Sequence, residues 1–197
     1  MTRARIILSI VVAAFFAATG TARAANILVN PGFETGNLAP WVIGNDFGGV
    51  EFWNVTNADA HTGTYSATVR GNLELLQNFD PVLGSDINEA SVWAKFVGDP
   101  TAIFVEVYYT DNSFAGNVFA PAAGTWTNLD ITSLIDPTKM VDAFGFYGCT
   151  GCGGDSRTFV DDALVDANVA AVPEPATLTL LGIGLVGIRR IARRTRV

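Results

Sequence analysis

The chain has 197 residues and a net charge of −7, from 12 basic and 19 acidic side chains. Eight of the basic residues lie near the two ends, so residues 25–172 keep only four basic against 18 acidic side chains. This length suffices for one domain with its own core, and the acidic surface excludes nucleic acid and anionic lipid as expected partners.

The N-terminal segment has the three parts of a secretory signal peptide. Arg3 and Arg5 precede an apolar run at 6–18, and residues 22–24 read Ala-Arg-Ala. The run is shorter than the roughly 20 residues that a membrane-spanning helix needs. We therefore expect a signal helix in residues 1–24 that is cleaved after Ala24; the alternative is an uncleaved N-terminal anchor.

Between the two ends the pattern is one of short alternating strands. The segment carries no sustained apolar period of 3.6 residues, and Gly, Pro, Asn and Asp separate the strands. The expected strands are 27–29, 50–55, 65–69, 89–96, 103–110, 125–131, 143–147 and 158–165, with one possible helical turn in 133–140. This pattern predicts an all-β domain at residues 25–170, an antiparallel β-sandwich or jelly roll.

Two cysteines, Cys149 and Cys152, lie in a glycine-rich loop near the end of the domain. In an oxidising compartment such a pair favours a local disulfide. A redox motif is the weaker alternative, because no βαβ pattern surrounds the pair. A zinc site is weaker still, because His61 is the one histidine and four ligands are needed.

The C-terminal segment, residues 171–197, also has three parts. Pro173, Glu174 and Pro175 precede an apolar stretch at 176–188, and arginines that include Arg189 and Arg190 follow it. Apolar residues on every face favour a short transmembrane helix over an amphipathic surface helix, and the arginines keep its end cytoplasmic.

This arrangement resembles the PEP-CTERM sorting signal of exported Gram-negative proteins. The resemblance covers about the last 25 residues. It implies an inner-membrane-anchored precursor that an exosortase-type enzyme processes near residues 172–175. The final location would be the cell envelope or the extracellular matrix.

Four short sequence segments within the domain point to a second family. They are Leu28 to Gly36, His61 to Ser66, Ser91 to Lys95 and Phe159 to Val165. In this order they resemble the carbohydrate-binding-module jelly rolls of the galactose-binding-like fold. The resemblance spans nearly the whole domain, although its middle part is generic for a β-sandwich.

That resemblance implies a structural calcium ion between the first and last strands. Its carboxylate ligands would be Glu34 together with Asp161 or Asp162. Two carboxylates from opposite ends of the chain repel each other unless a cation bridges them, and calcium accepts oxygen ligands. The alternative is a set of exposed carboxylates at strand ends.

Binding of extracellular polysaccharide would need exposed aromatic side chains as stacking platforms. The candidates are Trp53, Tyr109 and Phe114, and one of the adjacent Tyr108 and Tyr109 must face outward in an alternating strand. Three further tryptophans fit core positions better, namely Trp41, Trp93 and Trp126.

No catalytic motif is present in the sequence. His61 precedes a strand as a turn residue, and neither a Gly-x-Ser-x-Gly nor a His-Glu-x-x-His phrase occurs. We therefore expect a non-catalytic carbohydrate-binding module. The alternatives are a structural envelope or matrix protein without a small ligand and, further off, an enzyme that would need a buried carboxylate pair in a cleft.

Overall fold

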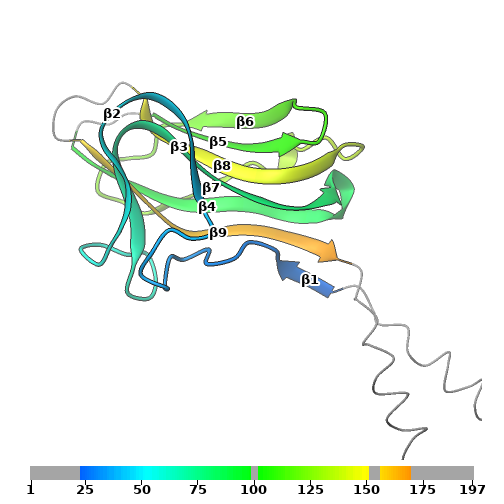
Figure 1. The fold of residues 1–197 in the computed structure, drawn as a ribbon, viewed down its shortest axis with the longest axis horizontal. Helices are drawn as coiled ribbons and strands as arrows, with labels where there is room; N and C mark the ends of the chain where they lie inside the picture. Colours follow the sequence, from blue (N-terminus) through cyan, green and yellow to red (C-terminus); the bar gives the residue numbers. More distant parts are fainter. Residues whose placement is uncertain (1–22, 99–101, 151–155, 170–197) are drawn as a thin grey trace, which may run out of the picture. The chain divides into compact units, whose positions relative to one another are not determined.

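The computed structural model describes residues 23–98, 102–150 and 156–169, which form nine antiparallel strands and two short 3-10 helices. The strands are β1 (Arg23–Asn26), β2 (Val42–Thr56), β3 (Ser66–Leu83), β4 (Ile87–Val97), β5 (Ala102–Tyr109), β6 (Phe114–Phe119), β7 (Thr127–Asp130), β8 (Met140–Thr150) and β9 (Arg157–Val169). The 3-10 helices are η1 (Gly84–Asp86) and η2 (Thr132–Leu134). Residues 24–169 are one compact unit (Figure 1).

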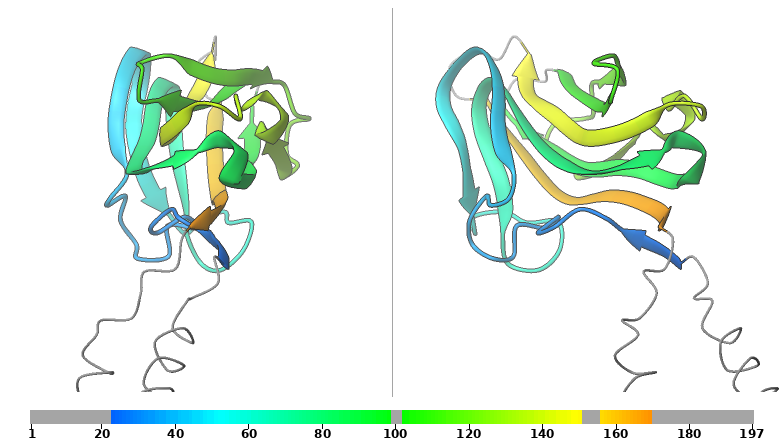
Figure 2. Two further views of the ribbon diagram at one scale, coloured as in Figure 1. Left: turned by 90° about the vertical axis from the view of Figure 1, so that its right-hand side faces the viewer. Right: turned by 45° about the vertical axis from the view of Figure 1, so that its right-hand side comes forward.

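The strands make two packed layers, and the two longest strands, β2 and β3, take part in both. One layer has the order β6-β5-β8-β3, and the other has the order β3-β9-β4-β7, with β1 beside β9. β3 belongs to both, because Ala67–Val69 pair with β9 whereas Glu74–Leu83 pair with β8. β2 pairs with residues 66–76 of β3, so the two strands curve together from one layer to the other (Figures 1 and 2).

The bend of β2 and β3 depends on two facing glycines. Gly49 and Gly71 are paired in the register, and Gly71 has a φ of 145°. A Cβ on Gly71 would lie 2.3 Å from the Cα of Gly49, closer than any side chain can approach. The two strands therefore approach each other this closely only because Gly71 has no side chain.

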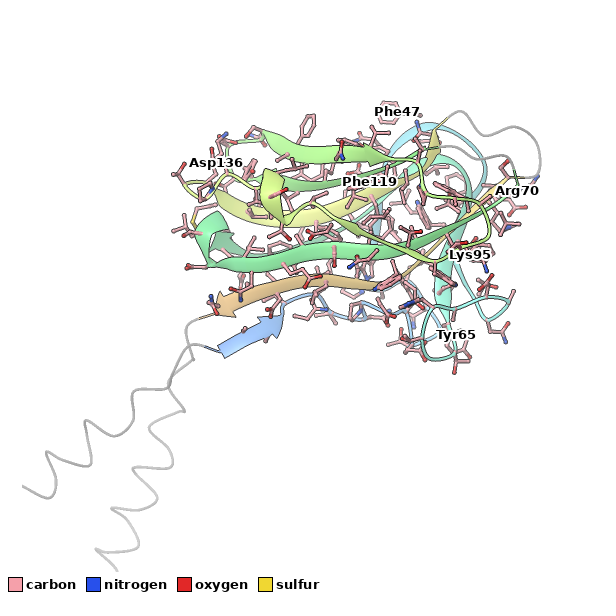
Figure 3. All side chains as sticks on the ribbon, turned by 180° about the vertical axis from the view of Figure 1, so that it is seen from behind. Phe47, Tyr65, Arg70, Lys95, Phe119 and Asp136 are labelled. Atoms are coloured by element: carbon pink, nitrogen blue, oxygen red, sulfur yellow. The ribbon has the colours of Figure 1, made fainter. Side chains whose placement is uncertain are left out.

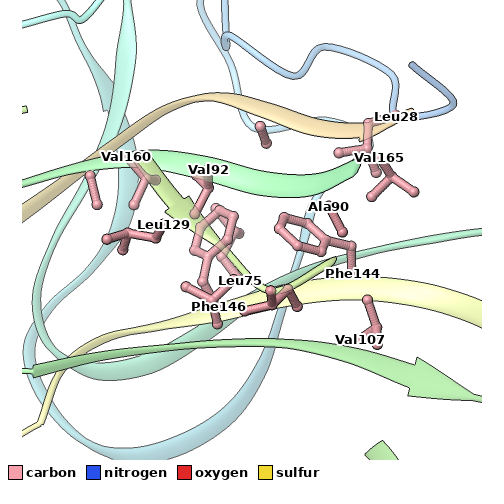
Figure 4. Close-up of a cluster of buried hydrophobic side chains, with 14 of the residues drawn as sticks. Leu28, Leu75, Ala90, Val92, Val107, Leu129, Phe144, Phe146, Val160 and Val165 are labelled. Atoms are coloured by element: carbon pink, nitrogen blue, oxygen red, sulfur yellow. The ribbon is translucent and has the colours of Figure 1, made fainter. Parts of the chain in front are cut away.

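The core lies between the layers and follows the strand alternation. Val105 and Val107 of β5 are fully buried, as are Val92 of β4 and Phe144 and Phe146 of β8. Figure 4 shows Val92, Val107, Phe144 and Phe146 meeting between the strands of the two layers. Because alternate residues face the core, the others form the outer face of each layer.

The predicted fold class is confirmed, and seven of the eight predicted strands overlap observed ones. β6 was missed, because its sequence Phe-Ala-Gly-Asn-Val-Phe is that of a half-exposed edge strand. The strand expected at 27–29 is wrong, since β1 ends at Asn26. β3 is far longer than the predicted strand at 65–69. Its register with β8 shifts between Asn78 and Val82, beside Pro81, but the strand continues through this irregularity.

Phe146 is the aromatic centre of the core, and its replacement tests the packing. Its ring lies 5.4 Å from Trp41, 5.6 Å from Trp53 and 6.1 Å from Phe144, measured between centroids. We expect Phe146→Ala to lower the free energy of unfolding by about 3–5 kcal/mol in urea denaturation of the full chain. Phe52→Ala, at a side chain that is 63% exposed, should change it by less than about 0.5 kcal/mol. Equal losses would contradict this packing.

Candidate functional site

A row of aromatic rings crosses the outer face of the layer that contains β5 and β8. The ring of Phe47 on β2 lies 5.6 Å from that of Tyr147, which lies 6.0 Å from that of Phe104. Phe104 in turn lies 6.1 Å from Phe114 on β6, and Phe114 lies 6.4 Å from Tyr108. Phe47 is 67% exposed and Phe114 is 59% exposed, and Figure 3 shows Phe47 projecting at the margin of its layer.

These rings line the larger part of a groove. This part, which we call the aromatic hollow, has a volume of about 510 Å³. The adjoining part, the polar hollow, has about 410 Å³ and shares Asn45 and Tyr108 with it. Further lining residues of the groove include Asn72, Val118, Asn78, Asn112 and Asp142. The residues that line either hollow include no lysine or arginine.

Two carboxylic side chains lie beneath the rings. Glu74 of β3 is 1% exposed and Glu106 of β5 is 2% exposed. The hydroxyl oxygen of Tyr108 lies 2.6 Å from Glu74 Oε1 and 2.7 Å from Glu106 Oε1. The other oxygen of Glu74 accepts hydrogen bonds from the backbone N–H of Asn45 (2.8 Å) and from its side-chain amide (2.9 Å), which also reaches the Tyr147 hydroxyl (3.2 Å).

Glycines on the neighbouring strands make room for this pair. A Cβ on Gly44 of β2 would lie 2.2 Å from Glu74 Oε2, and one on Gly116 of β6 would lie 2.7 Å from the Cβ of Glu106. Gly145 of β8 is the register partner of Glu106, so no side chain separates the two acids at that position. A larger residue at Gly44 or Gly116 would collide with these acids.

Burial changes the proton affinity of the cluster. It raises the pKa of Glu106 to about 7, and the nearby charge of Glu74 raises it further, while the hydrogen bond with Tyr108 acts in the opposite direction. Burial also raises the pKa of Tyr108, so this hydroxyl keeps its proton throughout the physiological range. The groove thus offers hydroxyl, amide and carboxyl groups among aromatic rings.

Two of the three predicted platform residues are not available for stacking. Trp53 is 3% exposed, and its indole N–H donates a hydrogen bond to the Leu73 carbonyl within the core. Tyr109 is 4% exposed, and its hydroxyl accepts the N–H of Asp136. The predicted platform role of both residues is wrong: Trp53 lies in the core, and Tyr109, although it lines the polar hollow, exposes too little of its ring for stacking. Phe114 does lie exposed on the groove, and its binding role stays a prediction.

The adjacent Tyr108 is the tyrosine that faces outward. Sequence reasoning did not select it or its partners Glu74, Glu106 and Tyr147. The alternation of Phe104, Glu106 and Tyr108 with buried valines was the available signal, since it places an acid between two aromatic residues on one face.

Two tryptophans expected in the core lie on the outer face of the other layer. Trp93 and Trp126 are half-buried there, whereas Trp41 is in the core as predicted. The imidazole of His61 stacks on Trp93 at 3.9 Å, and the Trp126 indole donates to Asp59 at 3.2 Å. A smaller hollow of about 290 Å³ lies beside Trp93.

The carboxylates of the predicted calcium site gather around one turn. Glu34 accepts the N–H groups of Thr64 and Tyr65, and Asp161 accepts those of His61 and Thr62. Asp162 lies 2.7 Å from the imidazole of His61. His61 thus belongs to a turn held by these acids.

Asp161 is the group in this turn that a cation would stabilise most. It is fully buried, and burial raises its pKa to about 6, with the charge of Asp162 adding to the effect. Within the described parts of the chain, however, no three His, Cys, Asp or Glu side chains are placed to hold one metal ion. A calcium ion would therefore need backbone carbonyl ligands beside the carboxylates, and the site stays a prediction.

Several predicted features lie outside the described residues. The predicted signal peptide is described only at its last two residues, Arg23 and Ala24, which form part of β1. The disulfide falls outside, since Cys152 and the side chain of Cys149 are not described, as do Pro173, Glu174, Pro175, Arg189 and Arg190. The described residues contain no helix that is long and apolar enough to cross a membrane.

Comparison with known proteins gives one family match and a set of similar folds. Residues 171–196 match the family described as the PEP-CTERM protein-sorting motif, which confirms the predicted sorting segment. No curated protein matches the chain.

Several of the solved structures that resemble the domain are carbohydrate-binding modules. TmCBM61 in complex with β-1,4-galactotriose is 22% identical, with a TM-score of 0.55 over 73% of this chain and 99% of that chain. A family 16 carbohydrate-binding module is 18% identical, with a TM-score of 0.53 over 70% and 97% of the two chains. The CBM22-1 xylan-binding domain of Paenibacillus barcinonensis Xyn10C is 15% identical, with a TM-score of 0.53 over 77% and 100%. The domain therefore has the β-sandwich fold of these modules.

Calcium binding at the turn is tested by thermal unfolding of the full chain. If calcium binds the folded state alone, a concentration 100 times its Kd adds about 2.7 kcal/mol to the free energy of unfolding and raises Tm. We expect Asp161→Asn to abolish this rise and Asp80→Asn, at an exposed acid of β3, to keep it. An identical wild-type Tm in calcium and in chelator would contradict the prediction.

Proposed function

We propose that this chain is an exported, non-catalytic carbohydrate-binding protein of the cell envelope or extracellular matrix, and that the groove over β5 and β8 binds the glycan. The observation that carries the proposal is the aromatic row above buried polar groups on an open sheet face. Aromatic faces pack against the C–H faces of sugar rings, while hydroxyl, amide and carboxyl groups orient the sugar hydroxyls.

The charge of the groove supports an uncharged glycan. No lysine or arginine lines either hollow to pair with a uronate or sulfate group, whereas Glu74, Glu106 and Asp142 do line them. The surrounding segment, with its four basic and 18 acidic residues, repels polyanions as well. Among the proteins of similar fold, one is described with bound β-1,4-galactotriose and another as xylan-binding, so these two glycans are suitable first probes.

Export and sorting follow from the two ends of the chain. The sorting motif at 171–196 supports processing by an exosortase-type enzyme, and the basic-apolar-small pattern of residues 1–24 supports secretion. Before processing, the apolar stretch 176–188 would anchor the precursor in the inner membrane.

An enzymatic role is the alternative that the buried acid pair raises, since paired carboxylates perform glycoside hydrolysis. The geometry favours binding instead. The Tyr108 hydroxyl fills the space between the two facing oxygens, at 2.6 and 2.7 Å, and both acids are almost fully buried. A glycosidic oxygen would have to displace this hydroxyl to reach both acids.

Replacement of the platform rings tests the binding role. We expect Phe114→Ala and Phe47→Ala each to weaken binding of galactan or xylan oligosaccharides about 3- to 10-fold, because each removes one exposed ring from the aromatic hollow. The measurement is isothermal titration calorimetry on the full chain in detergent, after a glycan array has selected the ligand.

The matched control is Phe52→Ala, which removes a ring that is equally exposed on β2 but does not line the groove. It should leave the affinity unchanged. A folded chain that binds no glycan on the array would overturn the proposal and favour a structural matrix protein without a small ligand. Release of reducing sugar from a bound glycan would instead favour the enzyme.

A further inference from the structure

If Glu74 and Glu106 were both ionised, the two contacts of the Tyr108 hydroxyl would lack one proton. Its oxygen lies 2.6 Å from Glu74 Oε1 and 2.7 Å from Glu106 Oε1, both hydrogen-bond distances. A phenol has one proton and donates it to one acceptor, and an ionised carboxylate only accepts. The second contact is therefore a hydrogen bond only if one of the two carboxyl groups is protonated and donates to the phenol oxygen.

Among the described residues, no other neighbour of the cluster can supply that proton. Asn45 donates to the opposite oxygen of Glu74, and the Tyr147 hydroxyl is 3.5 Å from that of Tyr108. The titratable groups that face the cluster are Glu74 from β3, Tyr108 from β5 itself and Tyr147 from β8. Asp142 of β8 lies further along the polar hollow.

Strands β2 and β6, which flank the cluster, bring no positively charged side chain to it. From β2 the cluster meets the neutral amide of Asn45, and the exposed Asp46 bonds to the N–H of Gly48. From β6 it meets Gly116 and the apolar Phe114 and Val118. Since the residues lining the groove include no lysine or arginine, a second negative charge beside Glu74 would be uncompensated.

We propose that the groove binds an uncharged oligosaccharide only while Glu74, Tyr108 and Glu106 share this extra proton. The inference rests on the proposed function of the groove. Tyr108 lines both hollows, so its position sets the shape of their junction. When the proton leaves, one of the two contacts becomes repulsive, the phenol ring is released from its place, and the binding surface opens at its centre.

The raised pKa of Glu106, about 7, places this change near neutral pH. The direction in which the affinity changes with pH follows from this pKa. Below pH 7 Glu106 is protonated and the cluster is intact, whereas above pH 7 it ionises and the affinity falls. If binding requires the proton, the affinity decreases by a factor of about 10 for each pH unit above the pKa.

The first experiment uses no glycan. The full chain, labelled with ¹³C at glutamate side chains and tyrosine rings, is titrated by NMR between pH 4 and 9. We expect the Glu106 carboxyl to titrate near pH 7 and the Tyr108 ring to shift with the same midpoint. Glu106→Gln should remove both transitions, because its amide is uncharged and can donate permanently to the phenol oxygen. Asp80→Asn, at an exposed acid, should leave both in place.

The second experiment measures the affinity for β-1,4-galactan and xylan oligosaccharides at pH 5.5 and pH 8.5. The wild type should bind at least about 10-fold more weakly at the higher pH, and Glu106→Gln should change less than about 2-fold. A Glu106 carboxyl that titrates below about pH 5, or wild-type binding that is equal at both pH values, would overturn the inference. Absence of glycan binding at every pH would overturn the proposed function, and the glycan-free titration would still decide whether the proton is shared.

Discussion

The outer face of the β5–β8 layer depends on one hydroxyl group that two buried acids share. Transferring an isolated carboxylate from water to the protein interior costs free energy, and Glu74 and Glu106 are almost completely buried. The Tyr108 hydroxyl between them and the two N–H groups of Asn45 supply the compensating hydrogen bonds. Polar groups can therefore lie beneath an aromatic surface without a basic residue among those that line the groove.

Strand alternation connects this face to the core. In β5 the valines at 105 and 107 pack between the layers, and the intervening residues Glu106 and Tyr108 face the groove. The same alternation buries Tyr109, whose hydroxyl anchors the chain near Asp136. The bend at Gly49 and Gly71 then brings the early part of β2, with Asn45 and Phe47, to the edge of the same groove.

The sequence predicted the fold class because alternation and turn residues are local features. It failed at β6 and along β3, where pairing with neighbouring strands outweighs glycine, asparagine and proline. It also failed at Trp53, because the nearby Glu51 and Asn54 favour an exposed position, whereas the indole N–H donates a hydrogen bond within the core. The acid pair could not be predicted, since the contact between residues 74 and 106 depends on register and on glycines in three other strands.

The most direct test of the central claim is a chemical-shift map of the full chain titrated with galactan or xylan oligosaccharides. The account predicts that the perturbed resonances belong to Phe104, Tyr108, Phe114 and Tyr147 and to Asn45 at the junction of the two hollows. Resonances of Trp93, on the other layer, should remain unchanged. Saturable shifts centred on Trp93, with none in the groove, would show that the glycan binds elsewhere and would contradict the account.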